Sequence, residues 1–90
     1  MAELERDATI VNPLGLHARP AAQFVRLASS FASDILVSKD GLDVNGKSIM
    51  GVMMLAAESG SAIRIRASGD DAERALDALC KLVAEGFGES

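Results

Sequence analysis

Residues 35–45 read ILVSKDGLDVN, and this stretch decides the fold expected for the chain. Apolar residues stand at alternate positions on both sides of a central Asp-Gly pair, which is the pair that favours a two-residue type I′ turn between strands. The segment therefore predicts an antiparallel β-hairpin whose turn is Asp40-Gly41. Ile35 and Val37 alternate with Leu36 and Ser38, and Leu42 and Val44 alternate with Asp43 and Asn45.

Two other segments predict strands that join the hairpin in one sheet. Residues 9–11 are Thr-Ile-Val, a β-branched run that stops at an Asn-Pro pair, and Asn-Pro favours a turn. Further along, Ile63 and Ile65 alternate with Arg64 and Arg66. This alternation predicts a half-buried strand with a solvated cationic face.

Two helices are indicated between these strands. The first begins at Pro20 and ends before Phe31, because apolar residues recur there at the spacing of one helical face. Those residues are Ala21, Phe24, Val25 and Ala28. The second is a short helix over residues 49–55, with Ser48 standing where an N-cap belongs.

The last helix has the most complete set of signals. Asp70 is expected as its N-cap, with Glu73 three residues on as in a capping box, and Gly86 fits its C-terminal cap. Cys80 lies at the edge of the buried stripe, where a small buried residue without chemistry is expected. The stripe itself is Ala72, Ala75, Leu76, Leu79 and Val83.

These elements give the order β-α-β-β-α-β-α and one domain over residues 1–90. Strands that alternate apolar and polar residues form a sheet that is covered on one face only. We therefore expect the α+β class, as a two-layer open-faced sandwich with a four-stranded antiparallel sheet and three helices on one face.

Composition excludes several functional classes. The 90 residues carry 9 Lys and Arg against 13 Asp and Glu, a net charge of -4, whereas nucleic-acid binders are typically basic. With one cysteine and one histidine, the chain offers neither a disulfide nor a set of zinc ligands, so no metal is expected. The longest apolar run, 49–57, is half of the ~20 residues that cross a membrane, and no signal-peptide core precedes it. We expect a cytoplasmic monomer.

The only histidine, His17, lies in the segment NPLGLHARPAA, residues 12–22. Pro20 belongs in the first turn of a helix, which places His17 at the helix entrance. The free amides and the positive dipole end there form an anion site, and Arg19 adds a guanidinium suited to phosphate oxygens. A neutral imidazole is a nucleophile toward phosphorus, and the same positive charges disfavour imidazolium. An ordinary helix start, with Arg19 in a surface ion pair, is the alternative that the residues alone leave open.

Two motifs carry a resemblance to a known family. Residues 15–21, GLHARPA, closely resemble the active-centre motif of the HPr phosphocarriers of the bacterial phosphoenolpyruvate-dependent phosphotransferase system. Residues 47–53, KSIMGVM, resemble that family's second signature, around its regulatory serine. The predicted order of elements agrees with the family, and the acidic end at 85–90 resembles its nitrogen-type carriers.

The resemblance implies a stoichiometric carrier rather than an enzyme, with no cofactor. His17 would accept phosphate on Nδ1 from phosphorylated enzyme I and pass it to the A domain of a sugar permease or of a regulatory branch. Arg19 would contact the phosphate. Ser48 would be the site of a regulatory serine kinase and phosphorylase, and a phosphate on an N-cap serine is compatible with the helix dipole.

The short helix over 49–55 has more apolar residues than one face can bury. Val52 and Leu55 are expected in the core, whereas Ile49, Met50 and Met53 are not all expected there, since methionine suits surfaces that meet several partners. In the HPr family this helix and the first one bracket the histidine and form the docking surface. Some relatives carry a polar residue at the position of Leu14, and leucine is expected to contact the partner instead. The docking residues implied are Leu14, Ala18, Ala22, Arg26, Lys47, Ile49, Met50 and Met53.

Two other classes of function stay open. One is a regulatory binding module that transfers no phosphate and acts through Ser48 and the helix over 49–55. Relatives of that kind lack the active histidine, whereas His17 and Arg19 are both present here. The other is a domain that senses an anion or a metabolite, and only the anion site expected at the helix entrance supports it.

Overall fold

The computed structural model describes residues 3–89, in which strands and helices alternate along the chain. The predicted order is confirmed, with one short 3-10 helix added after the last α-helix. No helix in residues 3–89 is both long and apolar enough to cross a membrane. The elements are β1 (Glu3–Thr9), α1 (Ala18–Ser29), β2 (Asp34–Lys39), β3 (Leu42–Asn45), α2 (Ile49–Met54), β4 (Ala62–Ser68), α3 (Ala72–Ala84) and η1 (Gly86–Gly88).

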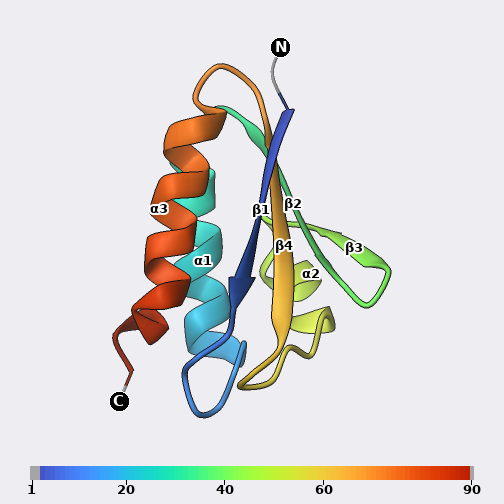
Figure 1. The fold of residues 1–90 in the computed structure, drawn as a ribbon, viewed down its shortest axis with the longest axis vertical. Coiled ribbons are helices and arrows are strands. Elements are labelled where there is room, and N and C mark those ends of the chain that lie inside the picture. The colour runs from blue at the N-terminus through green and yellow to red at the C-terminus, as the bar shows by residue number, and fades with distance from the viewer. Residues whose placement is uncertain (1–2, 90) are drawn as a thin grey trace.

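The strands form one antiparallel sheet in the order β1-β4-β2-β3. Helices α1 and α3 pack on one face of this sheet, and α2 contacts α1 and β3 (Figure 1). The strand side chains buried toward the helices are Ile35, Val37, Val44, Ile63, Ile65 and Ala67. The predicted two-layer α+β sandwich is confirmed.

The predicted hairpin is confirmed in its register. Lys39 pairs with Leu42, so the loop between β2 and β3 has two residues. Asp40 and Gly41 both take positive φ, 51° and 83°, as a type I′ turn requires. The turn residues therefore set the pairing of these two strands.

The predicted bounds of the first strand, residues 9–11, are wrong. Strand β1 starts at Glu3 and ends at Thr9, so it lies almost wholly before the β-branched run. It is an edge strand with mostly exposed side chains, and it therefore lacks the apolar alternation of a half-buried strand. Ile10, just after β1, is fully buried, which places the apolar signal where the chain leaves the sheet for the core.

The first helix starts earlier than predicted. Helix α1 begins at Ala18, and Pro20 is its third residue, where a missing N–H breaks no intrahelical hydrogen bond. The helix ends at Ser29, before Phe31 as predicted. His17 is the N-cap residue of this helix, so its predicted place at the helix entrance is correct.

The predicted capping box of the last helix is wrong, because the N-cap of α3 is Asp71 and not Asp70. The Asp71 carboxylate accepts hydrogen bonds from the Ser33 hydroxyl (2.5 Å) and from the amides of Ala32 (2.8 Å) and Ser33 (2.9 Å). These bonds, that of the hydroxyl most, lower the pKa of Asp71 to about 2. The Asp71 side chain thus makes no capping hydrogen bond to α3 and instead binds a loop that is distant in the sequence.

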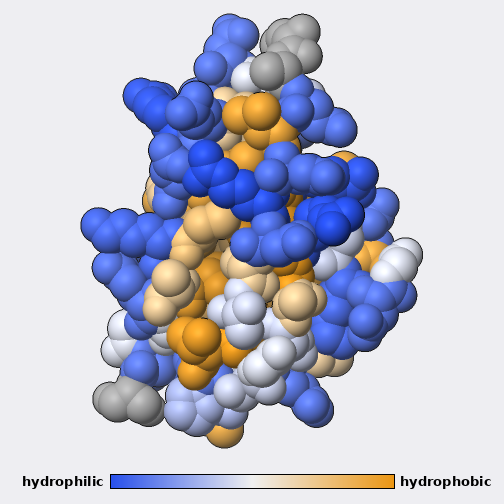
Figure 2. Space-filling model, viewed as in Figure 1, coloured by the Kyte–Doolittle hydropathy of each residue, from blue (hydrophilic) through white to orange (hydrophobic). Residues whose placement is uncertain are grey.

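The predicted buried stripe of α3 is confirmed, and its five residues are all buried. In Figure 2, apolar residues gather at the seam between α3 and β1, and hydrophilic residues cross it, as the pairing of Arg6 with Asp77 does. Cys80 lies at this seam and is only partly buried, and that burial raises the pKa of its thiol. The C-cap of α3 is Glu85, so the predicted glycine cap, Gly86, lies one residue beyond it, with φ 64°.

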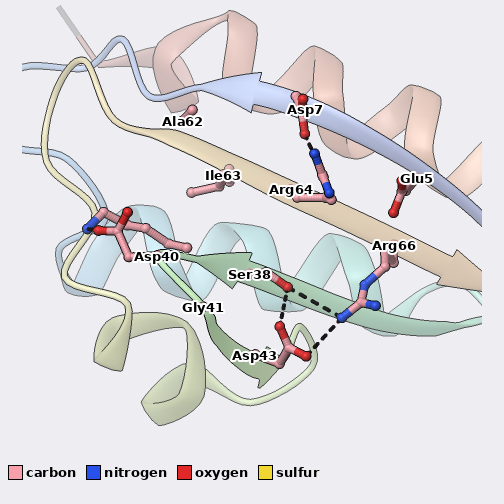
Figure 3. A pocket seen from close by; sticks show the side chains of 11 residues that line it. Glu5, Asp7, Ser38, Asp40, Gly41, Asp43, Ala62, Ile63, Arg64 and Arg66 are labelled. Carbon is pink, nitrogen blue, oxygen red and sulfur yellow. Dashed lines mark hydrogen bonds and ion pairs between the residues drawn. The ribbon is translucent and has the colours of Figure 1, made fainter.

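The open face of the sheet carries paired charges. Figure 3 shows Arg64 reaching Asp7 of β1 (2.9 Å) and Arg66 reaching Asp43 of β3 (3.0 Å). Hydrogen bonds from Ser38 and then from Arg66 lower the pKa of Asp43. The arginines predicted as solvated strand charges therefore do face away from the core, but they join neighbouring strands through cross-strand ion pairs.

Replacing Asp71 with asparagine is expected to lower the melting temperature by about 5 °C at neutral pH, because the loop loses a charged acceptor. A carboxylate with a lowered pKa stabilises the fold above its unfolded pKa, and this contribution is lost as the pH falls through the folded value. The difference between the wild type and Asp71→Asn should thus narrow from pH ~4 to ~2. Asp70→Asn, at an exposed neighbour, is the control for thermal unfolding. If the melting temperature fell by the same amount in both variants, the hydrogen bonds of Asp71 would not be the cause of the stabilisation.

Candidate functional site

The loop between β1 and α1 is held against the segment that precedes β4. The amide of Leu16 donates to the carbonyl of Ala57 (2.9 Å). Gly15 has φ 68°, and a Cβ there would lie 2.3 Å from the Ala57 oxygen and 2.9 Å from Cα of Glu58. Only glycine fits both this backbone conformation and this close approach. The position of His17, two residues on, depends on that fit.

His17 opens α1 without capping it through its side chain. Its carbonyl accepts the first intrahelical hydrogen bond, from the Ala21 amide (3.0 Å), while the imidazole makes no capping bond. Within residues 3–89 the amides of Ala18 and Arg19 have no acceptor, and Pro20 has no amide hydrogen to satisfy. His17 is therefore followed directly by two free donors at the positive end of a helix dipole, an arrangement that suits an anion.

The structure adds an acidic residue to this site. The Glu89 carboxylate lies 3.0 Å (Oε2) and 3.2 Å (Oε1) from His17 Nε2. Its Oε1 also accepts a hydrogen bond from Nδ2 of the buried Asn12 (3.0 Å), and that amide group donates to the Gly15 carbonyl (2.8 Å) as well. The Glu89 carboxylate thus joins two residues of the loop before α1, Asn12 and His17, to the tail after α3.

The charges at this site are consistent with an ionised Glu89. The hydrogen bond from Asn12, then that with His17, lowers the pKa of the Glu89 carboxyl, and the positive charge of Arg19 acts in the same direction. Arg19 itself is exposed on the first turn of α1. The two residues predicted to handle phosphate, His17 and Arg19, are therefore brought to the same helix end.

Asn12 and Glu89 were missed by the sequence predictions. The sequence predicts only an acidic extension at 85–90, whereas η1 turns this segment back and buries Phe87. A lone phenylalanine among glycines and acids is the signal that could have indicated a packed tail. Within residues 3–89 no group of three metal-ligating side chains is found.

Ser48 has the capping role that was predicted for it. Its hydroxyl accepts a hydrogen bond from the Gly51 amide at 3.1 Å, and it is the N-cap of α2. Such a bond is worth typically ~1 kcal/mol of stability. Ser48 is half-buried, so part of its side chain is accessible.

Comparisons with known proteins agree with the motifs around His17 and Ser48. The family described as "PTS HPr component phosphorylation site" matches residues 4–85. The phosphocarrier protein HPr of Cupriavidus necator is 51% identical over 96% of this chain and 97% of its own length. The chain belongs to the HPr phosphocarrier family. The phosphocarrier protein NPr of Shewanella violacea is 41% identical over 100% of this chain and 99% of its own, and the nitrogen-type assignment stays a prediction.

The fold agrees with a solved structure of the HPr family. The crystal structure of HPr-C-His from Thermoanaerobacter tengcongensis has a TM-score of 0.89 and 49% sequence identity, and the match covers 100% of this chain and 99% of that one. A likeness over the whole chain at this identity extends to the loop before α1 and to α2, which carry the two HPr motifs.

The residues predicted to dock HPr partners are largely exposed. Leu14 and Met50 expose 75% and 74% of their surface. Ile49, Met53, Ala18 and Arg26 are also exposed, and Ala22 is half-buried. Val52 and Leu55 are buried, as predicted. These exposed apolar side chains, with Met54, which was not predicted, are called the apolar patch below; its members are Leu14, Ile49, Met50, Met53 and Met54.

Lys47 differs from the other predicted docking residues. Its ammonium donates a hydrogen bond to the carbonyl of Phe31 at 2.8 Å, and its side chain is half-buried. Part of its role is therefore to hold the turn before α2 against the loop that follows α1.

Replacing Gly15 with alanine is expected to lower the melting temperature by about 10 °C or more, because a left-handed backbone costs ~1–2 kcal/mol and the collision with Ala57 adds to it. Gly60→Ala is the matched control, since Gly60 has φ 90° but a Cβ there meets nothing within 4 Å. Thermal unfolding of both variants separates backbone strain from collision. If Gly60→Ala lost as much stability as Gly15→Ala, the collision would have no part in fixing this loop.

Proposed function

We propose that this protein is a phosphocarrier that accepts a phosphoryl group on Nδ1 of His17 from phosphorylated enzyme I and passes it to an A domain of a permease or of a regulatory branch. The observation that carries the proposal is the place of the imidazole at the N-cap of α1, beside the free amides of Ala18 and Arg19. Membership of the HPr family supports it.

The chemistry is a transfer of a phosphoryl group from the donor to a histidine nitrogen, and it needs no cofactor. The lone pair of Nδ1 attacks phosphorus, a nitrogen–phosphorus bond forms on His17, and the bond from phosphorus to the donor breaks. The helix amides and the guanidinium of Arg19 stabilise the charge on the phosphoryl oxygens during the transfer. In the second transfer the same bond breaks and its electron pair returns to Nδ1, so the protein is a carrier and not an enzyme.

The apolar patch is the surface we assign to the partners. Its exposed leucine, isoleucine and methionine lie in the loop before α1 and on α2, which contacts α1, and they suit several differently shaped partners because methionine is flexible and polarisable. Arg26 and Ala22, on α1, extend this surface. Both enzyme I and the A domains would use it in turn, with this protein acting as a cytoplasmic monomer.

Ser48 is proposed as a regulatory phosphorylation site for a serine kinase, with a phosphorylase to reverse it. Its oxygen already caps α2, so a phosphate would lie at the positive end of that helix without unfolding it. The same charge would stand next to Ile49 of the apolar patch, where a partner must remove water to bind. Regulation would therefore act on docking rather than on the fold.

His17→Ala is expected to gain no acid-labile phosphate when it is incubated with enzyme I and phosphoenolpyruvate, because the chain has no other histidine. Its melting temperature should stay within ~3 °C of that of the wild type, as for most changes outside the buried core. Intact-mass measurement of both proteins checks the first point. If His17→Ala gained phosphate to the same extent as the wild type, the proposed function would be wrong.

Ser48→Asp is expected to slow phosphorylation of His17 by about tenfold, equivalent to ~1.4 kcal/mol, with an unchanged or higher melting temperature, since aspartate caps helices well. Ser48→Ala is the reciprocal control. It loses the cap, about 1 kcal/mol, but adds no charge, and so it should be less stable and yet be phosphorylated normally. The rate of phosphorylation by enzyme I is measured for both variants. A normal rate for Ser48→Asp would show that the surface around Ser48 does not dock enzyme I.

A further inference from the structure

The tail after α3, residues 86–89, packs against the rest of the structure. Phe87 is 3% exposed, with φ 58°. The amide of Glu89 donates to the Gly86 carbonyl at 2.9 Å. A Cβ at Gly86 would lie 3.6 Å from Val11 and 3.7 Å from Asn12, so this turn packs against the loop that leads to His17. The buried phenylalanine two residues earlier thus fixes the backbone that carries Glu89.

The carboxylate of Glu89 is held from two sides. Asn12, which is 1% exposed, donates to Oε1 at 3.0 Å and to the Gly15 carbonyl at 2.8 Å. Imidazole Nε2 lies within 3.2 Å of both carboxylate oxygens. An exposed ion pair contributes little, but the Glu89 side chain is only 19% exposed, and its second partner is a buried amide. Through these contacts the Glu89 carboxylate orients the imidazole of His17.

The hydrogen-bond roles follow from the charge of Glu89. An ionised carboxylate can only accept hydrogen bonds, so the hydrogen between it and the ring belongs to Nε2 of His17. In a neutral imidazole the other nitrogen, Nδ1, then has no proton and carries a free lone pair. Within residues 3–89 no hydrogen bond engages Nδ1.

We propose that Glu89 is a positioning residue that holds neutral His17 in the tautomer with the proton on Nε2, so that Nδ1 is the nucleophile. The inference rests on the proposed function for its consequence, phosphoryl transfer, but not for the tautomer. When Nδ1 forms its bond to phosphorus, the Nε2 proton stays in place and the ring becomes positively charged. The Glu89 carboxylate, in contact with Nε2–H, stabilises that charge.

The test combines the tautomer with the transfer rate. ¹⁵N chemical shifts of the imidazole, recorded on the alkaline plateau where the ring is neutral, report which nitrogen carries the proton. The rate of phosphorylation by enzyme I and phosphoenolpyruvate is measured on the same samples. The variants are Glu89→Ala, which removes the acceptor, and Glu89→Gln, which keeps an acceptor oxygen without the charge. Glu85→Ala is the control, because it removes an exposed carboxylate from the same segment.

In Glu89→Ala we expect a mixture of tautomers and phosphorylation slower by roughly tenfold or more. Glu89→Gln should keep the Nε2 tautomer and be slowed less, and Glu85→Ala should match the wild type in both measurements. The proposal is overturned if Glu89→Ala keeps either the wild-type tautomer or the wild-type rate. If the wild type itself takes no phosphate, the proposed function fails, and the shifts alone still decide whether Glu89 sets the tautomer.

Discussion

The close approach of Gly15 to the backbone of Ala57 is the constraint on which the site depends. The loop after β1 can turn into α1 only if residue 15 takes a left-handed backbone and has no Cβ. That turn sets where α1 begins and therefore which residue is its N-cap. His17 stands there because of a contact with residues about forty positions away, and not because of its own helix preference. The free amides of the first turn come with it.

A second constraint brings the tail after α3 to the loop after β1. Strand β1 and helix α3 pack along one seam, so the loop after β1 and the turn after α3 end on the same side of the molecule (Figure 1). Phe87 is therefore buried in the core, and the Glu89 carboxylate two residues on contacts His17. Two elements of the fold therefore position the imidazole: the start of α1, which carries it, and the tail after α3, which contacts its Nε2.

The features that could be predicted from the sequence are those whose causes are local. Asp40-Gly41 sets its own turn, Ser48 caps the helix that follows it, and the α3 stripe follows from helical spacing. The errors involve non-local contacts: Asp71, and not Asp70, stands at the N-cap position of α3, and its carboxylate bonds to the loop after α1. The Glu89 contact joins residues 72 positions apart, and no spacing rule reports such a pair. The resemblance to HPr identified His17 and Arg19, but not the carboxylate behind the ring.

A carrier must release the group that it accepts, and this limits how tightly the site can hold a phosphoryl group. On the proposed function, the cradle is shallow: two helix amides and one exposed guanidinium, with the imidazole side chain 37% exposed. The Glu89 carboxylate acts in two opposed ways. It stabilises the positive ring of the phosphorylated histidine through Nε2, yet its negative charge repels the phosphoryl oxygens on the other nitrogen. Because these two effects oppose each other, the carboxylate can orient the ring without making the phosphorylated form too stable to pass its group on.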